Sequence, residues 1–369
     1  MSWESILGHN RVRQQFALAM ANDRLASTFL FLGPDGIGKR TFALKLAQTL
    51  LCPRASDFHP CGVCPSCRQL LAGEHPDFEY LCRLPDRNQI MLEQLIGEKG
   101  DREGFCHSIA KKPFYGGRKV AILDDADDLK HEGANALLKT LEEPPPNSII
   151  ILIGTAEQRQ LPTIRSRCQI VRFQPLNWED VLQILLQKEL VSPPDIAERL
   201  ARSSGGSVQN ALHLFGEDVL DFRLQWLEHL ATGRATAEAF IKSMQSFVDR
   251  AGKESTPKRR RLIQVAAWAA EYFRQTLAVL ANGRLTSTMN EYPDQELIQL
   301  AISGAQQWRG TLESMTVALD RCLMVESQVM ANAHVAALIE SWLLDLNQAA
   351  QAKIPFYPSL ATISPLAYR

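Results

Sequence analysis

A short apolar segment, a glycine-rich loop and a helical segment follow one another near the start of this 369-residue chain. Thr28 to Leu32 is an apolar run typical of a buried strand, and Phe42 to Leu51 is predicted to be a helix. The loop between them contains Gly33, Pro34, Asp35, Gly36, Ile37, Gly38 and Lys39. In this context, loop N–H groups and the lysine can cradle phosphate at the helix N-terminus. The alternative is a glycine-rich turn that binds no ligand.

The residue after the loop lysine departs from the pattern of a working nucleotide hydrolase. That residue is usually Ser or Thr, because its hydroxyl oxygen ligates the Mg²⁺ that bridges the β- and γ-phosphates. Here it is Arg40, whose guanidinium has five donors and no acceptor. Thr41 carries a hydroxyl, but one residue further along a helix it points about 100° away. The chain therefore has the design of an ATPase without its metal ligand.

Two acids end a second apolar run. Val120 to Leu123 leads directly into Asp124 and Asp125. At this place nucleotide hydrolases hold Mg²⁺ and polarise the attacking water. Asp124 fits the metal role, and Asp125 stands in the water-polarising position, where the longer Glu is usual. The alternative is an acidic helix start, in which Asp125, Asp127 and Asp128 serve as N-terminal caps and partners of the helix dipole.

Strand and helix signals alternate over the first 174 residues. Further apolar runs predict strands at Phe78–Leu81, Ile149–Ile153 and Ile170–Phe173, and a helix is predicted at Ala134–Glu142. Continuous apolar strands separated by helices indicate a parallel sheet that is covered on both faces.

Beyond residue 175 the strand signal ends. Residues 177–215 indicate a few short helices with a break at Gly205 and Gly206, and residues 217–346 indicate long helices. One apolar helix face is predicted to contain Ile263, Ala266, Ala267, Ala270, Phe273, Leu277 and Leu280. The sequence thus predicts domains at 1–174, 175–215 and 216–350, followed by an irregular tail at 351–369.

Four of the eight cysteines lie close together, in a segment inserted at 52–67 after the predicted helix. They are Cys52, Cys61, Cys64 and Cys67. In a cytosolic chain such a cluster favours metal over disulfides, and four thiolates suffice for a closed, structural Zn²⁺ site. An iron–sulfur cluster is the alternative. The proline that often follows the fourth ferredoxin cysteine is missing after Cys67, although Pro53 follows Cys52.

Charge gives no global attraction to nucleic acid or anionic lipid, because 40 basic and 41 acidic side chains leave a net charge of -1. Two local basic clusters could contact DNA phosphates or be solvated faces: Lys111, Lys112, Arg118 and Lys119, and residues 258–261. No leader pattern and no apolar stretch of about 18 residues is found. We expect a cytoplasmic protein that does not contact membranes.

Together these motifs resemble the AAA+ clamp-loader family over the first 215 residues. The resemblance rests on Phe29–Lys39, the four cysteines, Asp124 with Asp125, Ala136–Pro145 (ALLKTLEEPP) and Ser166–Cys168. It implies an α/β P-loop (AAA+) domain with a parallel sheet, a small helical lid domain and an all-α C-terminal collar domain. In this family the collar joins five subunits into a ring that loads the sliding clamp onto primed DNA.

The resemblance also implies roles for single residues. Arg167 matches an arginine finger offered in trans to a neighbouring ATPase subunit, although a lone arginine is otherwise most often a surface residue. Thr155 matches a sensor at the end of the fourth core strand. Gln209 stands where motor subunits usually carry a second sensor, an arginine. With Arg40, this predicts a non-hydrolysing subunit of the bacterial replicative polymerase holoenzyme and leaves ATP or ADP binding open.

The implied partners are the motor and delta subunits of the loader, the sliding clamp, and primer–template DNA through the assembled complex. An ATP-hydrolysing motor-type clamp loader or a helicase-loader ATPase is the main alternative. A hydroxyl after Lys39 and an arginine at position 209 would favour it, and both are missing. A zinc-dependent DNA-binding module is the third hypothesis, and the neutral net charge counts against it.

Overall fold

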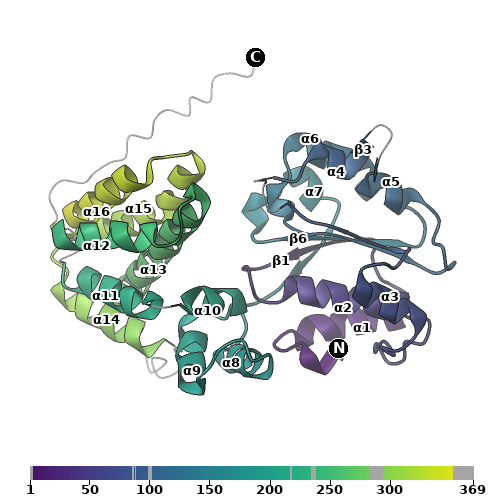
Figure 1. The fold of residues 1–369 in the computed structure, drawn as a ribbon, viewed down its shortest axis with the longest axis horizontal. Coiled ribbons are helices and arrows are strands. Elements are labelled where there is room, and N and C mark those ends of the chain that lie inside the picture. The colour runs from purple at the N-terminus through teal and green to yellow at the C-terminus, as the bar shows by residue number, and fades with distance from the viewer. Residues whose placement is uncertain are drawn as a thin grey trace, which may run out of the picture. The chain divides into compact units, whose positions relative to one another are not determined.

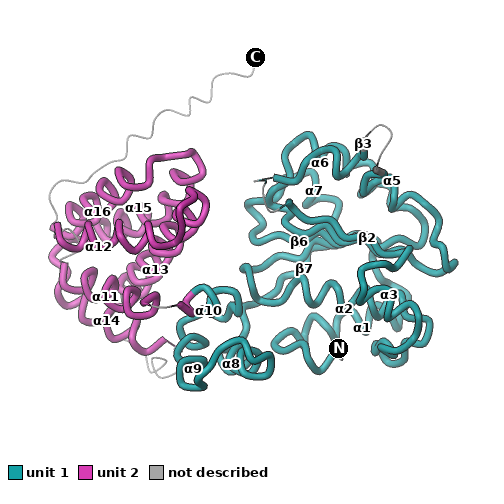
Figure 2. Tube along the Cα trace, viewed as in Figure 1, with its two compact units in different colours: residues 1–213 teal, residues 214–369 magenta. Residues whose placement is uncertain are grey.

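The computed structural model describes residues 3–84, 87, 89–98, 102–216, 218–233, 238–282 and 294–351. The chain divides into two compact units, residues 1–213 and 214–369 (Figure 2). Among the described residues, no helix is both long and apolar enough to cross a lipid bilayer.

The first unit is built around a five-stranded parallel sheet with the order β2-β5-β6-β1-β7. Its strands are β1 (Thr28–Leu32), β2 (Phe78–Leu81), β5 (Lys119–Leu123), β6 (Ser148–Gly154) and β7 (Gln169–Arg172). The three inner strands are buried along their whole length. This is the burial that continuous apolar runs predict for a sheet covered on both faces.

Helices cover both faces of this sheet (Figure 1). Phe29 and Phe31 of β1 pack in a cluster with residues of α1 (Asn10–Ala21) and α2 (Lys39–Leu51). Leu30 and Leu32 point to the other face. That face is covered by α4 (Leu92–Ile96), α5 (Phe105–Ala110), α6 (His131–Glu142) and α7 (Pro162–Arg165). The predicted α/β architecture is confirmed.

Short elements complete the first unit. A helix follows the cysteine segment, α3 (Pro65–Ala72), and a small hairpin is formed by β3 (Gly97–Glu98) and β4 (Arg102–Glu103). Three helices follow the sheet: α8 (Trp178–Gln187), α9 (Pro194–Ser203) and α10 (Val208–Leu214). The predicted break at Gly205 and Gly206 lies between α9 and α10. Because the boundary between units falls after residue 213, a separate lid domain stays a prediction.

The second unit is helical, as predicted. It contains α11 (Val219–Ala231), α12 (Glu238–Asp249), α13 (Ser255–Asn282), α14 (Gln295–Gln307), α15 (Leu312–Met330) and α16 (Val335–Ala350). α13 packs against α11, α12, α14, α15 and α16. Of the predicted tail, only Gln351 lies within the described residues.

The predicted apolar face of α13 needs a correction. Ala266, Ala270 and Phe273 are buried, but Ala267 is exposed. Leu262, Val265, Ala269 and Tyr272, which the prediction left out, are buried as well. A helix with neighbours on several sides buries more than one stripe, so a single-face pattern describes it poorly.

Candidate nucleotide and metal sites

The loop between β1 and α2 has a backbone that only glycine adopts easily. Gly33 has φ +154°, and a Cβ there would lie 2.5 Å from the carbonyl oxygen of Phe173. Gly38 is left-handed, with φ 100°, and directly precedes α2. The helix therefore begins at Lys39, three residues before its predicted start at Phe42, with its N-terminus facing the loop.

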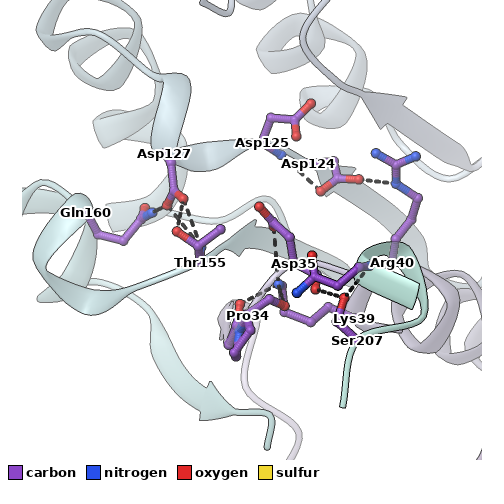
Figure 3. Close-up of polar contacts among 12 residues, drawn as sticks. Pro34, Asp35, Lys39, Arg40, Asp124, Asp125, Asp127, Thr155, Gln160 and Ser207 are labelled. Carbon is purple, nitrogen blue, oxygen red and sulfur yellow. Dashed lines mark hydrogen bonds and ion pairs between the residues drawn. The ribbon is translucent and has the colours of Figure 1, made fainter. Parts of the chain in front are cut away.

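The ammonium group of Lys39 turns back onto its own loop (Figure 3). Its Nζ donates to the carbonyl oxygens of Gly33 at 2.5 Å and Pro34 at 2.6 Å, and lies 3.8 Å from Oδ1 of Asp35. Burial lowers the pKa of Lys39, while the charges of Asp35 and Asp124 oppose this effect. The loop thus satisfies its own lysine, and a phosphate would have to replace two carbonyl acceptors.

The Arg40 side chain pairs with Asp124, 84 residues away along the chain (Figure 3). Nε of Arg40 donates to Oδ2 of Asp124, and the hydroxyl of Tyr80 donates to the same oxygen at 3.0 Å. The Asp124 side chain is 8% exposed. Burial alone would lower the pKa of Arg40, but the Asp124 carboxylate raises it above its ordinary value. The carboxylate oxygen predicted to hold metal is therefore occupied by two protein donors.

Asp125 follows in a left-handed backbone conformation, with φ 55° and ψ 39°. Its Oδ2 accepts from the backbone N–H of Arg83 at 3.4 Å. Burial and the neighbouring Asp124 charge raise the pKa of Asp125. Its predicted role in polarising water stays a prediction.

The side chain of Thr155 is held by Asp127 (Figure 3). The Thr155 N–H lies 3.1 and 3.0 Å from the two carboxylate oxygens, and its hydroxyl donates to one of them. Gln160 donates to the other oxygen. The carbonyl of Thr155 accepts from the N–H of Gly33 at 3.1 Å, so this cluster is joined to the loop.

The start of α10 lies against the loop. Ser207 Oγ donates to the carbonyl oxygen of Asp35 at 2.7 Å, and the N–H of Val208 donates to that of Gly36 at 3.0 Å. A Cβ on Gly36 would lie 2.3 Å from the Cβ of Gln209. The structure therefore brings Gln209 directly to the loop, whereas Thr41 is exposed on α2.

Arg167 lies near the surface beside the end of α6. Its Nε donates to Oε1 of Glu142 at 2.7 Å, its Nη2 donates to the same oxygen, and its Nη1 donates to the carbonyl oxygen of Thr163 at 2.8 Å. The side chains of Arg167 and Glu142 are 29% and 48% exposed. The carboxylate partner belongs to the segment ALLKTLEEPP.

The four clustered cysteines converge, with their sulfur atoms within 4.8 Å of one another. N–H groups of Cys61, Cys64 and Cys67 donate to the sulfurs of Cys52, Cys61 and Cys64 respectively, each at 3.4 Å. Backbone N–H groups lower the pKa of Cys61 to about 6, whereas burial raises the pKa of Cys67 to about 12. The four sulfurs could hold one metal ion. A tetrahedral thiolate set fits Zn²⁺, and an iron–sulfur cluster remains open.

Four residues that contact the candidate site residues were not themselves predicted from the sequence to belong to the site. They are Tyr80, Asp127, Glu142 and Ser207. Tyr80 had a usable signal, since it lies on a predicted strand that could neighbour the one ending at Asp124. The other three contacts depend on loops and helix ends, whose positions the sequence pattern does not fix.

Comparisons with known proteins find similarity over part of the chain. A family described as DNA polymerase III, delta subunit, matches residues 8–177. DNA polymerase III subunit delta' of Pseudomonas aeruginosa is 38% identical over 204 residues, covering 55% of this chain and 60% of that protein. Subunit delta' of Bacillus subtilis is 32% identical over 208 residues, covering 56% and 59%. Subunit tau of Escherichia coli is 30% identical over 218 residues, covering 58% and 32%. The match therefore spans about three fifths of the delta' relatives.

Proposed function

We propose that the chain is a clamp-loader subunit that does not hydrolyse ATP itself, on the premise that its residues 8–177 match the family described as DNA polymerase III, delta subunit. The observation that carries the proposal is the contact of Arg40 and Tyr80 with one oxygen of Asp124. A cation already stands where Mg²⁺ would need an oxygen ligand. Loss of one preorganised charge-stabilising group typically lowers a rate by about 10²- to 10³-fold.

The second sensor position supports the same proposal. Gln209 lies against Gly36, where an arginine would bring positive charge to the γ-phosphate. A neutral amide cannot supply that charge. Two charge-stabilising groups are thus absent from one site, and their losses act in the same direction.

We further propose that Arg167 acts in trans. Its guanidinium pairs with one carboxylate, the exposed Glu142, and also donates to the carbonyl oxygen of Thr163. Guanidinium geometry suits carboxylate and phosphate equally, so a neighbour's nucleotide can take the place of Glu142. The partners would be ATPase and delta subunits of the loader, the sliding clamp, and primer–template DNA through the complex, all in the cytoplasm.

The nucleotide proposal predicts negligible DNA-stimulated ATP hydrolysis by the purified chain. Added Mg²⁺ should leave its ATP affinity unchanged, because Asp124 already has a cationic partner. Arg40→Thr, which restores a hydroxyl, should make ATP affinity depend on Mg²⁺. Isothermal titration calorimetry with and without Mg²⁺ measures both.

Arg11→Thr is the matched control, since Arg11 is an exposed arginine on α1. It should behave like the wild-type chain. Turnover at the rate of a motor subunit, or wild-type ATP affinity that rises with Mg²⁺ as much as that of Arg40→Thr, would overturn the proposal.

For the cysteine cluster we propose a structural Zn²⁺ held by Cys52, Cys61, Cys64 and Cys67. Zinc binding at such sites contributes about 10 to 16 kcal/mol of apparent free energy, so a segment with little core of its own can fold around it. Metal analysis of the purified chain should return about one zinc per chain.

Cys67→Ser should lose that zinc and lower the protease resistance of residues 52–72. Cys82→Ser, which changes a cysteine outside the cluster, should retain both. Recovery of iron, or of no metal from freshly purified protein, would contradict the zinc assignment.

A further inference from the structure

A turn at the end of the sheet where the strands begin presents two aromatic side chains to solvent. Phe114 is 75% exposed and Tyr115 is 54% exposed. The turn is closed by the N–H of Gly116, which donates to the carbonyl oxygen of Pro113 at 3.3 Å. The turn precedes β5, whereas the phosphate loop follows β1. Because these strands are parallel, the turn and the candidate nucleotide site lie at opposite ends of the strands.

A buried carboxylate holds this turn from below. Asp77 is 2% exposed, and its two oxygens accept from the N–H groups of Phe114 at 2.5 Å and Tyr115 at 3.0 Å. The carbonyl of Asp77 accepts from the N–H of Val120 at 2.9 Å. A carboxylate is buried at low free energy only when its hydrogen bonds are satisfied. The turn is therefore a fixed platform rather than a loop tip that adjusts.

The turn is also joined to α3, the helix that follows the cysteine cluster. The Tyr115 hydroxyl donates to Oε1 of Gln69 at 3.1 Å, and its ring meets that of His75 edge to face at 5.6 Å. Nε2 of His75 lies 2.8 Å from Oγ of Ser66. Since the N–H of Asp77 donates to Nδ1 of His75, Nε2 carries the proton and donates to Ser66.

Cations flank the two aromatics, and residues 104–123 contain no acid. Lys112 is exposed. Lys111 pairs with Glu103, and Arg118 lies 3.8 Å from Asp23. These two carboxylates are 56% and 96% exposed. Such surface pairs contribute little, about 0 to 1 kcal/mol, so an incoming phosphate can replace them.

From this arrangement we propose that residues 111–118 bind single-stranded nucleic acid. Phe114 and Tyr115 stack on unpaired bases, and Lys111, Lys112 and Arg118 pair with the phosphates. Every base has a π-face, so rigid exposed aromatics beside cations form a sequence-tolerant platform. The buried core of a protein interface would instead be depleted in lysine. A Cβ on Gly116 or Gly117 would meet nothing within 4 Å, which leaves open space beside the turn.

The test uses the purified full-length chain without nucleotide and a fluorescent oligothymidylate of about 20 nucleotides. Fluorescence anisotropy at low salt should show binding, and Phe114→Ala should weaken it about 5- to 150-fold, the range for loss of one stacked base. A duplex of the same length should bind more weakly, because its bases offer no free face. Leu18→Ala, at an apolar residue of α1 that is 64% exposed, should leave affinity unchanged.

Two further variants separate stacking from charge. Phe114→Trp should retain affinity, because an indole ring stacks as well as a phenyl ring. Lys112→Gln should weaken binding and reduce the slope of log K against log salt by about 0.7.

Three results would overturn the inference: no binding by the wild-type chain, equal affinity for duplex, or unchanged affinity of Phe114→Ala. The last result would assign the aromatic turn to a protein partner. The inference does not depend on the proposed function, since the assay contains no ATP and no other subunit.

Discussion

Two arginines of this chain both pair with a carboxylate, but in different settings. Arg40 reaches Asp124, which is 8% exposed and which also accepts from the Tyr80 hydroxyl. Arg167 reaches Glu142, which is 48% exposed. The arginines themselves rank the other way, with Arg40 56% exposed and Arg167 29% exposed. The chemistry of the two side chains is the same, so the pairs differ chiefly in the burial of the carboxylate partner.

This contrast suggests how a subunit can stop hydrolysing nucleotide and still serve its neighbours. The proposed loss of function at Arg40 uses a bond to a buried carboxylate, Asp124, that also accepts from the Tyr80 hydroxyl. The proposed gain at Arg167 uses a bond that another anion can replace. Experiments on the two pairs should therefore give effects of different kinds and sizes.

The largest expected effect concerns Arg167. In a loader assembled with its ATPase subunits, Arg167→Ala should lower single-turnover hydrolysis at the adjoining site by about 10³- to 10⁵-fold, because the transition-state charge loses its trans partner. Rapid-quench assays of the assembled complex measure this rate, and size-exclusion chromatography checks that assembly is intact.

Arg172→Ala provides the matched control, since Arg172 lies on β7, is 62% exposed and pairs with Glu157. It should leave the rate unchanged. If a loader containing Arg167→Ala assembles normally and hydrolyses ATP at the wild-type rate, Arg167 is not an arginine finger. The difference between the two arginine pairs would then have no functional meaning.

A smaller effect is expected for the pair of Arg40 with the buried Asp124 carboxylate. Arg40→Ala leaves the Asp124 carboxylate with the Tyr80 hydroxyl and without its cation. Loss of one partner of a fully buried pair costs about 3 to 5 kcal/mol. Because Arg40 itself is 56% exposed, we expect a loss of only about 1 to 2 kcal/mol in the free energy of unfolding. Urea denaturation measures it as a lower midpoint with an unchanged slope.

Glu142→Gln tests the exposed pair in the same way that Arg40→Ala tests the pair with the buried Asp124. An exposed pair contributes about 0 to 1 kcal/mol, so this change should have the smallest effect on stability. Equal losses for Arg40→Ala and Glu142→Gln would show that burial does not distinguish the two pairs.

Much of the sheet domain could be predicted from the sequence because its strands are continuous apolar runs. Thr28–Leu32 and Phe78–Leu81 were predicted with the bounds that the structure gives. The small elements between β2 and β5 were not predicted, since α4 and α5 are too short for a helical period to be visible. The single face predicted for α13 failed at Ala267 because α13 has neighbours on several sides.

The candidate site could be predicted where its residues form a local sequence motif. It could not be predicted where residues far apart along the chain come into contact. The loop motif identified Lys39 and Arg40, but the carbonyls that hold Lys39 follow from backbone geometry. Asp124 was predicted as a metal ligand, and its pairing with Arg40 across 84 residues depends on the order of strands in the sheet. Glu142 belonged to a motif used only for the resemblance, so its contact with Arg167 was not expected.

The contact between α10 and the phosphate loop has a mechanical consequence. Ser207 and Val208 each donate a hydrogen bond to a loop carbonyl, and Gly36 leaves no room between loop and helix. Swinging α10 away would break both bonds, at a net free energy of about 1 to 3 kcal/mol. The loop and the start of this helix are thus fastened to each other, so any movement of one without the other must first break these two bonds.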